Sequence, residues 1–471
     1  MARLYIVSPD CGAQSQFEAD VLGAGGARPA ASIASLALPT LAAFAPDDFP
    51  VELCDERIAP ADLEHPAEHV WITCNSMQFA RMRELASEYR RRGKTVAVGG
   101  PFATLSPEAV RPHCDILFRG EFESAADEVF ADLRSGRWKE EYLGPPAELE
   151  RSPLPRWDLY PNDRAWIAAV QASRGCPNEC GFCEVIRYYG RRVRRKPAAR
   201  VLAELDELRR RGYRGVLLSD DNLAAEPGAA KELLEAVGGW SRRRRGGAVR
   251  FWAQMTPADG RDPELLSLAV RAGIAHAYVG VETPDQAGLA EAGKRRSLGV
   301  DLAEALRAFL RHGIDAVASL IVGFDCDDAG TFGRHEEFIG RVPLPLAQIG
   351  PLVLTSGTPL HRRFQAEGRL RWGATAPGLP WTTNVVPKRM TQDQLLRGLA
   401  GLYRRLYAPE AFAGRLRGAL ALAGRQGQRV AAARPGQLHS AETDASALVE
   451  RRLREDPELA SLACGVREAE G

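Results

Sequence analysis

The stretch Ala168-Ala-Val-Gln-Ala-Ser-Arg-Gly-Cys-Pro-Asn-Glu-Cys-Gly-Phe-Cys183 joins a short apolar run to three cysteines with the spacing CxxxCxxC. The run Ala168–Ala172 predicts a buried strand, which places Cys176, Cys180 and Cys183 on the loop that follows it. Three thiolates at this spacing can ligate three irons of a [4Fe-4S] cluster and leave the fourth iron open. A structural zinc ion needs four ligands, and no fourth Cys or His lies close in the sequence. Zinc with a ligand from elsewhere in the fold, or buried structural cysteines, are the alternatives.

The alternation of apolar runs and helical patterns continues beyond the cysteines. The runs predict further strands at Gly215–Ser219, Val249–Gln254, His276–Val281, Ala316–Val322 and Leu346–Leu354. The intervening segments predict helices over Ala198–Arg211, Ala229–Val237, Pro263–Ala272 and Val300–His312. Consecutive βα units predict a partial or full TIM-type barrel, a (β/α)6 sheet over residues 165–380, with its chemistry at the carboxyl ends of the strands.

A second alternating region precedes the cysteines. Its predicted strands are Leu4–Ser8, Val51–Cys54, Val70–Cys74, Thr95–Gly99 and Asp115–Gly120. Strands separated by helices predict a doubly wound, Rossmann-like α/β domain over residues 1–140, whose ligands bind at the carboxyl ends of the strands. Residues 141–164 are rich in Pro, Arg and Trp and predict an extended linker. Residues 381–471 predict a helical C-terminal extension with a loosely ordered tail.

Composition narrows the class of partner. The 62 Lys and Arg residues balance 61 Asp and Glu residues, so no long-range field points to a nucleic acid, and a small-molecule substrate is expected. The basic run Arg191–Lys196 is expected to be solvated rather than to bind a phosphate or carboxylate. No apolar run is long enough for a transmembrane segment and the N-terminus lacks a signal-peptide pattern, so a cytoplasmic protein is expected. Nine cysteines, three of them clustered, fit metal binding in a reducing compartment better than disulfides.

The segment Ser173–Cys183 resembles the signature of the radical S-adenosylmethionine (SAM) superfamily. Gly175 and Pro177 fit the shape of its loop, and Phe182 matches the aromatic residue that commonly precedes the third cysteine. The resemblance implies that the open iron binds the amino and carboxylate groups of SAM. One electron, from a donor such as flavodoxin or ferredoxin, would then cleave SAM to a 5′-deoxyadenosyl radical. The cofactor carries this chemistry and the protein positions it.

Polar residues end several of the later predicted strands. Asp221 and Asn222 follow Gly215–Ser219, Gln254 ends the next strand, and Glu282 follows His276–Val281. In a barrel enzyme such positions line the active site. The alternative is that the acidic residues cap helices, as they often do at such loop positions.

The superfamily resemblance implies a SAM-binding role for some of these strand ends. Glu282 would hold the amino or ribose end of SAM. Ile321 and Gly323, in the segment Ser319-Leu-Ile-Val-Gly-Phe324, would flank the adenine. Lys294 is a more speculative contact of the same site.

A doubly wound domain that precedes such a barrel resembles the cobalamin-binding branch of the superfamily. Its candidate cobalamin-binding residues lie at predicted strand ends: Asp55, Glu56, Asn75, Ser76, Gly99, Gly100, Thr104, Gly120 and Glu121. The glycine pair would permit close approach of the backbone to a bulky ligand. Thr104 and Glu121 would bond its amide or nucleotide groups, and the loop with Asn75 and Ser76 would face the lower side of the cobalt.

The domain departs from classical cobalamin domains in one motif. None of the eight histidines lies in an Asp-x-His-x-x-Gly context. Cobalamin would therefore bind without that histidine as its lower ligand, which is usual in this branch. The alternative is a Rossmann-like domain that binds nothing and only packs on the barrel.

The resemblance extends toward the C-terminus. The segments Gly190–Pro197, Gly357–Leu360 and Thr383–Met390 resemble a cobalamin-type branch that includes hopanoid and bacteriochlorophyll C-methylases. This implies a C-methyltransferase that acts on an unactivated carbon of a lipid, pigment or secondary metabolite through a 5′-deoxyadenosyl radical and methylcobalamin. No motif identifies the substrate.

Other functions stay open at this stage. A cobalamin-dependent rearrangement, cyclisation or oxidation would use the same cofactors without methyl transfer. A methylthiotransferase would need a second cluster on three N-terminal cysteines, and Cys11 and Cys74 loosely match two of them while Gly99–Pro101 supplies no third. A sensor that binds SAM and cobalamin without turnover is a non-enzymatic alternative, against which the intact cysteine triplet argues.

Overall fold

The computed structural model describes residues 3–10, 31–243, 248–371 and 383–432. The N-terminal region forms a parallel sheet with the strand order β3-β1-β4-β5-β6-β7. Its strands are β1 (Leu4–Ser8), β3 (Val51–Asp55), β4 (His69–Thr73), β5 (Thr95–Gly99), β6 (Ile116–Gly120) and β7 (Glu141–Gly144). We call it the N-terminal sheet. The chain leaves β1 for β3 on one side and returns to β4 on the other, as the doubly wound class requires, so the predicted class is confirmed.

Helices and aromatic side chains cover the N-terminal sheet. The helices are α1 (Ala37–Ala42), α2 (Phe79–Arg91), α3 (Pro101–Leu105), α4 (Pro107–Val110) and α5 (Ala126–Ser135). Trp71 on β4 is buried, and its ring centroid lies 5.1 Å from Phe118, 5.0 Å from Phe122 and 5.5 Å from Phe130. Such tilted aromatic contacts add to the burial of apolar area.

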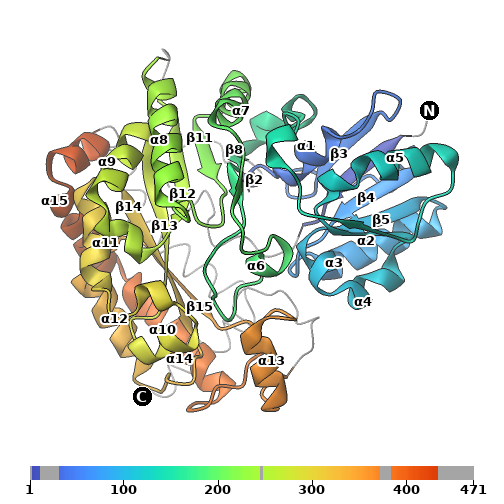
Figure 1. The fold of residues 1–471 in the computed structure, drawn as a ribbon. Helices are drawn as coiled ribbons and strands as arrows, with labels where there is room; N and C mark the ends of the chain where they lie inside the picture. Colours follow the sequence, from blue (N-terminus) through green and yellow to red (C-terminus); the bar gives the residue numbers. More distant parts are fainter. Residues whose placement is uncertain (1–2, 11–30, 244–247, 372–382, 433–471) are drawn as a thin grey trace.

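The second sheet is also wholly parallel, with the order β15-β14-β13-β12-β11-β8-β2. Its strands are β2 (Ala31–Ile33), β8 (Ala165–Val170), β11 (Gly215–Leu218), β12 (Arg250–Met255), β13 (Ile274–Glu282), β14 (Asp315–Val322) and β15 (Ala347–Pro351). We call it the barrel sheet. β2 and β15 form its two edges, so the sheet curls into an open, partial barrel, as predicted (Figure 1).

Helices cover the outer face of the barrel sheet (Figure 1). They are α7 (Ala198–Arg210), α8 (Pro227–Arg242), α9 (Pro263–Ala272), α11 (Leu302–Arg311) and α12 (Thr331–Arg341). α9 illustrates why the sequence sets these limits. The Asp262 carboxylate accepts a hydrogen bond from the Leu265 amide at its start, and Gly273, with φ of 102°, ends it in the left-handed conformation.

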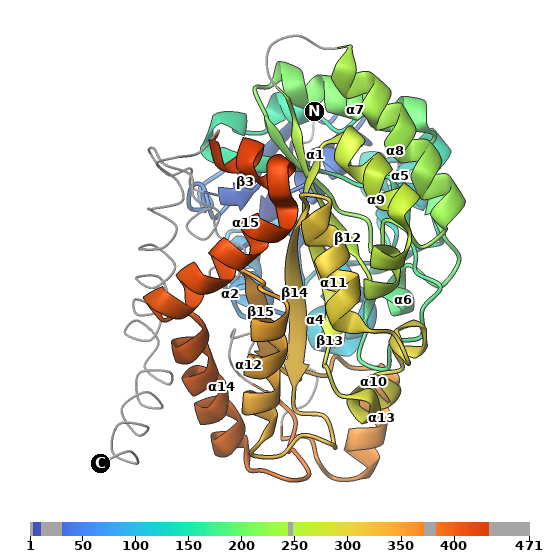
Figure 2. The same cartoon turned by 90° about the vertical axis from the view of Figure 1, so that its left-hand side faces the viewer.

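The C-terminal extension is helical, as predicted, and packs against the last strand. Its described helices are α14 (Gln392–Leu406) and α15 (Pro409–Ala432), and Figure 2 shows α14 beside α12. The helix α13 (Pro359–Ala366) precedes the extension, within the segment predicted as barrel, and the predicted tail beyond residue 432 lies outside the described residues. The hydroxyls of Tyr403 and Tyr407 each bond both backbone groups of one β15 residue, at 2.8–3.1 Å. The side chains of this region therefore form the hydrogen bonds that the backbone N–H and C=O groups at the outer edge of β15 need.

The structure differs from the sequence-based expectation at two edges. β7 lies in the segment expected to be an extended linker, yet it pairs with β6 over Leu117–Gly120. β2, which follows the undescribed residues 11–30, pairs with β8 and so joins the barrel sheet to the N-terminal region. Short strands with few alternating positions give little periodic signal in a sequence.

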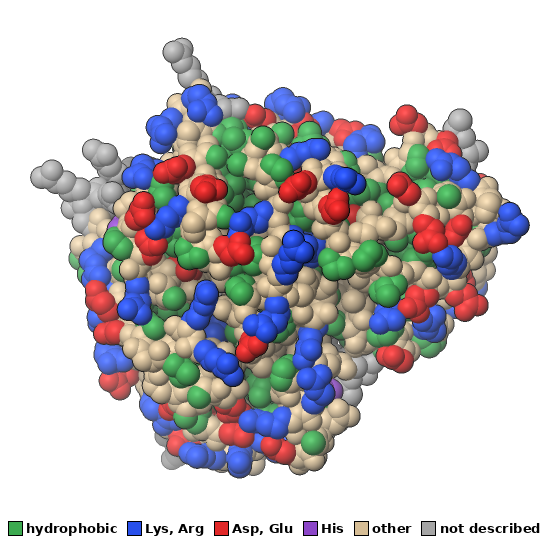
Figure 3. Space-filling model, in the orientation of Figure 1, with side chains coloured by type: hydrophobic (Ala, Val, Ile, Leu, Met, Phe, Trp, Pro, Cys, Tyr) green, Lys and Arg blue, Asp and Glu red, His purple; other side chains and the backbone are tan. Residues whose placement is uncertain are grey.

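The described surface carries no single dominant charge. Figure 3 shows basic and acidic side chains interspersed over one face, in keeping with the near balance of charges in the sequence. Among the described helices, none is both long and apolar enough to cross a bilayer.

Candidate active site

The carboxyl ends of the two sheets meet in space. Arg174, just after β8, pairs with Glu121, just after β6. The short helix α6 (Val185–Tyr188), from the cysteine loop, packs on α3 of the N-terminal region (Figure 1). Ligands of both sheet types bind at these ends, so one shared site would receive them.

The three cysteines lie on a loop closed at its base by a two-stranded ribbon. The ribbon consists of β9 (Ser173–Arg174) and β10 (Arg194–Arg195), which pair antiparallel. Within the loop, the Cys176 amide donates to the carbonyl of Gly190 at 3.3 Å, and Gly181 donates to that of Ala292 at 2.8 Å. The loop is thus tied both to itself and to the end of α10 (Gln286–Glu291).

The environment of the thiols disfavours their ionisation in the absence of a positive partner. Cys176 and Cys180 are buried and Cys183 is half-buried. Burial raises the pKa of Cys183 to about 12, and the amides of Val185 and Ile186 partly offset this by hydrogen bonding to the thiol. Burial likewise raises the pKa of Cys180. A metal cluster would supply the positive charge that thiolates in such a site need.

The donor set fits a [4Fe-4S] cluster with one open iron. All three cysteines are free of disulfides, and each of the Cys180 and Cys183 thiols lies within electrostatic range of Cys176. Among the described residues, no three His, Cys, Asp or Glu side chains already stand in a metal-binding arrangement. All three cysteines lie on one loop, whose base is closed by the β9–β10 ribbon and whose Gly181 is tied to Ala292 and Leu360.

Two consecutive carboxylates after β11 anchor the start of the cysteine loop. Asp220 is fully buried and accepts hydrogen bonds from the Ala172 amide and the Ser173 hydroxyl. Asp221 accepts from the amide of Gly175 at 3.0 Å, and burial raises the pKa of its carboxyl to about 6. The helix-cap alternative is thus replaced by a loop-anchoring role for both residues.

Asn222 is the next residue and differs from both aspartates. Its side chain is buried, and its Oδ1 has no hydrogen-bond partner among the described residues. A buried carbonyl oxygen without a donor is costly, so a ligand hydroxyl or amino group fits here.

Glu282, at the end of β13, holds a strained conformation. It is the one non-glycine residue of the described chain with positive φ, at 65°, and the strand register shifts beside it. Its carboxylate pairs with Lys294 Nζ at 2.6 Å, and Lys294 also donates to the Gly280 carbonyl at 3.2 Å. Although burial opposes it, Glu282 raises the pKa of the Lys294 ammonium. Such strain is common at functional sites.

A pocket opens on the outer side of the cysteine loop. Cys180, Thr256 and Lys294 line it, together with the segments Pro177–Glu179 and Arg295–Ser297. Lys294, the partner of Glu282, therefore lines this pocket together with the cysteine loop.

The inner face of the barrel sheet is open beside these residues. Gln254 is exposed although its strand β12 lies in the interior of the sheet, and it stands opposite Tyr278 in the register. Ile321 on β14 is half-buried. Gly323 has a φ of 129°, and its amide donates a hydrogen bond to the Asp327 carboxylate at 2.7 Å. These predicted residues lie at the carboxyl ends of β12 and β14, the two neighbours of β13 in the sheet.

At the N-terminal sheet, the predicted acidic residues already have protein partners. Arg57 pairs with Asp55 at 2.5 Å, and the Tyr160 hydroxyl donates to the same carboxylate at 2.8 Å. Arg81 donates to both oxygens of Glu56, at 2.7 and 3.0 Å. These carboxylates stabilise the sheet edge.

The predicted glycines and Thr104 are also used by the chain itself. A Cβ on Gly100, at φ of 109°, would lie 2.8 Å from the Cys74 carbonyl, and one on Gly120 would lie 2.1 Å from that of Gly144. On Gly99 it would lie 3.1 Å from the Phe118 side chain. The Thr104 hydroxyl accepts from the Gly120 amide and donates to Gly100, both at 3.0 Å. Close approach of loop to loop thus accounts for the glycines.

Asn75 and Ser76 are two further predicted residues, and the Asn75 Oδ1 accepts a hydrogen bond from the Gln78 amide at 3.0 Å. Asn75 is exposed and Ser76 half-buried, in the loop that follows β4. This strand lies beside β1, where the chain changes direction across the sheet, which is the usual place for a ligand. Asn75 and Ser76 are therefore the predicted residues best placed to contact a ligand of this sheet.

The expectation that Arg191–Lys196 is solvated is wrong for part of the run. Arg194 binds Glu121, and Lys196 forms a buried pair with Glu204 at 2.5 Å. A run of basic residues carries no information on distant carboxylates, so the sequence alone could not pair them. Arg174 and Glu123, which complete this network, were likewise missed.

Comparisons with known proteins add to this geometry. Residues 170–339 match the model of the radical SAM superfamily, and residues 358–451 match a domain of unknown function (DUF4070). An uncharacterised methyltransferase, sll1242 of Synechocystis sp. (strain ATCC 27184 / PCC 6803 / Kazusa), is 30% identical over 390 residues, which cover 80% of this chain and 71% of that protein.

A second relative carries a named activity. Hopanoid C-2 methylase of Rhodopseudomonas palustris (strain TIE-1) is 31% identical over 341 residues, or 71% of this chain. The chain spans 64% of the length of that methylase.

A solved structure extends the likeness in fold to the whole chain. The cobalamin-dependent SAM radical enzyme OxsB, with aqua-cobalamin and SAM bound, superposes with a TM-score of 0.67 at 13% identity, over 99% of this chain and 81% of that one.

Proposed function

This chain belongs to the radical SAM superfamily, and we propose that it is a cobalamin-dependent radical SAM C-methyltransferase acting on a small molecule. The names of the relatives, a hopanoid C-2 methylase and a methyltransferase, support methyl transfer as the reaction. The observation that carries the proposal is the meeting of the two sheet edges. The three cysteines of the barrel sheet lie on a loop whose helix α6 packs on α3 of the N-terminal sheet. Two cofactors can therefore act on one substrate.

When bound, the cluster with SAM supplies radical chemistry and cobalamin supplies methyl transfer. Cys176, Cys180 and Cys183 would hold the cluster. The Glu282 carboxylate, held by Lys294 at 2.6 Å, would bind the amino group of SAM through a charge-assisted hydrogen bond. The orphaned Oδ1 of Asn222 would accept a hydrogen bond from SAM or from the substrate.

The remaining residues orient the ligands. Asp220 and Asp221 accept hydrogen bonds from the first residues of the cysteine loop, so they would hold in place the start of the loop that binds the cluster. Ile321 supplies an apolar surface for the adenine, and Gly323 lets the chain turn beside it. Gln254, exposed on the inner face, would contact the substrate. On the N-terminal side, Asn75 and Ser76 would contact cobalamin.

Anaerobic reconstitution tests the proposal. We expect the purified chain to bind iron and sulfide, to take up cobalamin with a change in its visible spectrum, and to transfer the labelled methyl group of SAM to a lipid or pigment substrate in the presence of a one-electron donor such as flavodoxin or ferredoxin. A reconstituted chain that binds no cobalamin contradicts the proposal. A product without the label would instead indicate a radical rearrangement, cyclisation or oxidation.

A further inference from the structure

The ribbon of β9 and β10 brackets the whole cysteine loop. Residues 175–193 run from one strand to the other, and they contain all three cysteines. In the ribbon, Arg174 stands directly opposite Arg194. Like charges in this position repel each other, so the ribbon closes only if a partner neutralises them.

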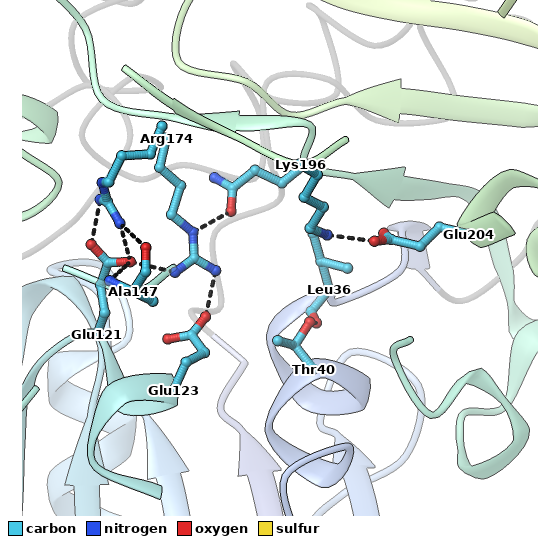
Figure 4. A network of polar contacts seen from close by, with 10 residues as sticks. Leu36, Thr40, Glu121, Glu123, Ala147, Arg174, Lys196 and Glu204 are labelled. Carbon is cyan, nitrogen blue, oxygen red and sulfur yellow. Dashed lines mark hydrogen bonds and ion pairs between the residues drawn. The ribbon is translucent and has the colours of Figure 1, made fainter. Parts of the chain in front are cut away.

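That partner is Glu121, which comes from the other sheet (Figure 4). Its Oε2 accepts from Arg174 Nη1 at 2.7 Å and from Arg194 Nη1 at 2.9 Å, and its Oε1 accepts from Arg194 Nη2 at 2.5 Å. Glu123 accepts from Arg174 Nη2 at 2.5 Å. One carboxylate of the N-terminal region thus holds both strands at the base of the loop.

The network is shielded from solvent and balanced in charge. Side-chain exposure is 3% for Glu121, 10% for Arg174 and 15% for Arg194. Although burial favours its protonated form, Arg174 lowers the pKa of the Glu123 carboxyl, so this carboxylate stays ionised. Two guanidinium groups therefore face two carboxylates, and loss of Glu121 would leave a buried excess of positive charge.

We propose that Glu121 is a positioning residue that closes the base of the cysteine loop and so fixes the loop against the N-terminal sheet. Arg174 and Arg194 are its partners in this role. The inference replaces the expected contact of Glu121 with cobalamin, because both of its oxygens are already occupied. The proposal rests on the proposed function in one respect only. The proposed function identifies the two cofactors, and the Glu121 contact would set the distance between them.

A neighbouring ion pair offers a matched control. Lys196, in the residue after β10, pairs with Glu204 on α7 at 2.5 Å, with side-chain exposures of 9% and 2% (Figure 4). This pair is as buried as the Glu121 network, but both partners belong to the barrel region. Glu204→Gln therefore removes a buried ion pair without releasing the contact between the sheets.

Hydrogen–deuterium exchange of the cofactor-free chain tests the proposal directly. We expect Glu121→Gln to speed amide exchange across residues 173–195 by about tenfold or more, since a hydrogen bond to a charged group is lost at each arginine. Glu204→Gln should speed exchange in α7 and leave residues 173–195 less affected. Equal exchange of these residues in the two variants would overturn the proposal.

A double variant separates positioning from a general loss of stability. Glu121→Gln/Arg194→Gln removes the uncompensated charge and leaves the Arg174–Glu123 pair, so it should restore part of the slow exchange. Failure of any rescue, with both variants unfolded by circular dichroism, would also count against the proposal.

The reconstituted protein adds a spectroscopic readout. The magnetic interaction between the reduced cluster and cob(II)alamin should weaken or broaden in Glu121→Gln at unchanged iron content, and keep its wild-type form in Glu204→Gln. A wild-type protein that binds no cobalamin would defeat the proposed function, and the exchange experiment on the cofactor-free chain would still decide the role of Glu121.

Discussion

The two sheet edges that meet at the site use their polar residues differently. On the barrel side, the cysteines are free thiols, the Asn222 oxygen lacks a described partner, and Gln254 is exposed. On the N-terminal side, Asp55, Glu56, Thr104 and Glu121 all bond to the protein itself. The barrel edge thus keeps some polar groups without a described partner beside the paired Asp220, Asp221 and Glu282, whereas these four N-terminal residues hold their own loops and the neighbouring sheet.

The difference shows what a polar residue at a strand end means. Such a residue can serve either a ligand or a neighbouring loop, because both need hydrogen-bonding groups at the carboxyl ends of the strands. Whether its partner is a ligand or another side chain depends on distant residues such as Arg57 or Arg174. The predictions below test this division.

The largest effect is expected from the cysteines. Cys176→Ala/Cys180→Ala/Cys183→Ala should lower iron from about four atoms per chain to below about one, and abolish SAM cleavage, because the ligands of the cluster are gone. Iron and sulfide analysis with the visible spectrum measures this. Cys114→Ala is the control, since Cys114 is also half-buried and its pKa is also raised by burial. A triple variant with full iron content would show that these three cysteines do not bind the cluster.

Glu282 should have the next largest effect. Glu282→Gln removes the charge that would bind the amino group of SAM, and we expect SAM affinity to fall by about 10- to 100-fold, since hydrogen bonds between charged groups contribute about 1.5–3 kcal/mol. Calorimetric titration of the reconstituted protein measures this. Glu264→Gln, which breaks an exposed pair with Lys231, should change nothing measurable. Unchanged SAM affinity in Glu282→Gln would argue that the Lys294 pair is purely structural.

A pair of variants at the N-terminal edge sharpens the comparison. Glu56→Gln should lower the free energy of unfolding by about 1–3 kcal/mol, because its side chain is 3% exposed and Arg81 would lose the more buried of its two carboxylate partners. The free energy with which this variant binds cobalamin should stay within about 0.5 kcal/mol of the wild-type value. Asn75→Ala/Ser76→Ala should instead weaken cobalamin binding, and loss of the exposed Asn75–Gln78 hydrogen bond should lower the free energy of unfolding by no more than about 1 kcal/mol.

Thermal unfolding of the cofactor-free chain and absorbance titration with cobalamin give the two quantities. Loss of cobalamin binding in Glu56→Gln at full stability would restore Glu56 as a ligand and contradict the division between the edges.

The smallest effect concerns pH. Burial raises the pKa of Asp221 from 3.8 to about 6. Between pH 3.8 and about 6, the folded chain therefore keeps a proton on this carboxyl that the unfolded chain has lost. Its ionisation therefore costs stability above pH about 6, and the cost disappears as the pH falls toward 4. The free energy of unfolding of Asp221→Asn, measured relative to that of the wild type, should therefore be about 1 kcal/mol higher at pH 7.5 than at pH 5.

Thermal unfolding at both pH values measures this difference. Asp262→Asn is the control, because Lys231 lowers the pKa of Asp262 despite its burial, and this variant should show no such gain at high pH. A pH-independent difference for Asp221→Asn would mean that its carboxylate is solvated.

The sequence predicted the periodic parts of the fold well. β1 and β5 have the predicted limits, and β13 extends the predicted His276–Val281 by two residues at its start and one at its end. β7 and β2 escaped because a strand of three or four residues has too few alternating positions to stand out. The cysteine spacing carried the chemistry on its own. The partners of Glu121 and Glu56 did not follow from the sequence, since tertiary pairing leaves no local pattern.

The tyrosine hydroxyls on β15 have a consequence for the behaviour of the chain in solution. An open barrel leaves a strand whose unpaired backbone groups can recruit another chain, and such edges promote aggregation. Tyr403 and Tyr407 occupy the backbone groups of Ile349 and Ala347 and so block that route. The region that matches a domain of unknown function thus covers backbone groups at the β15 edge of the barrel sheet.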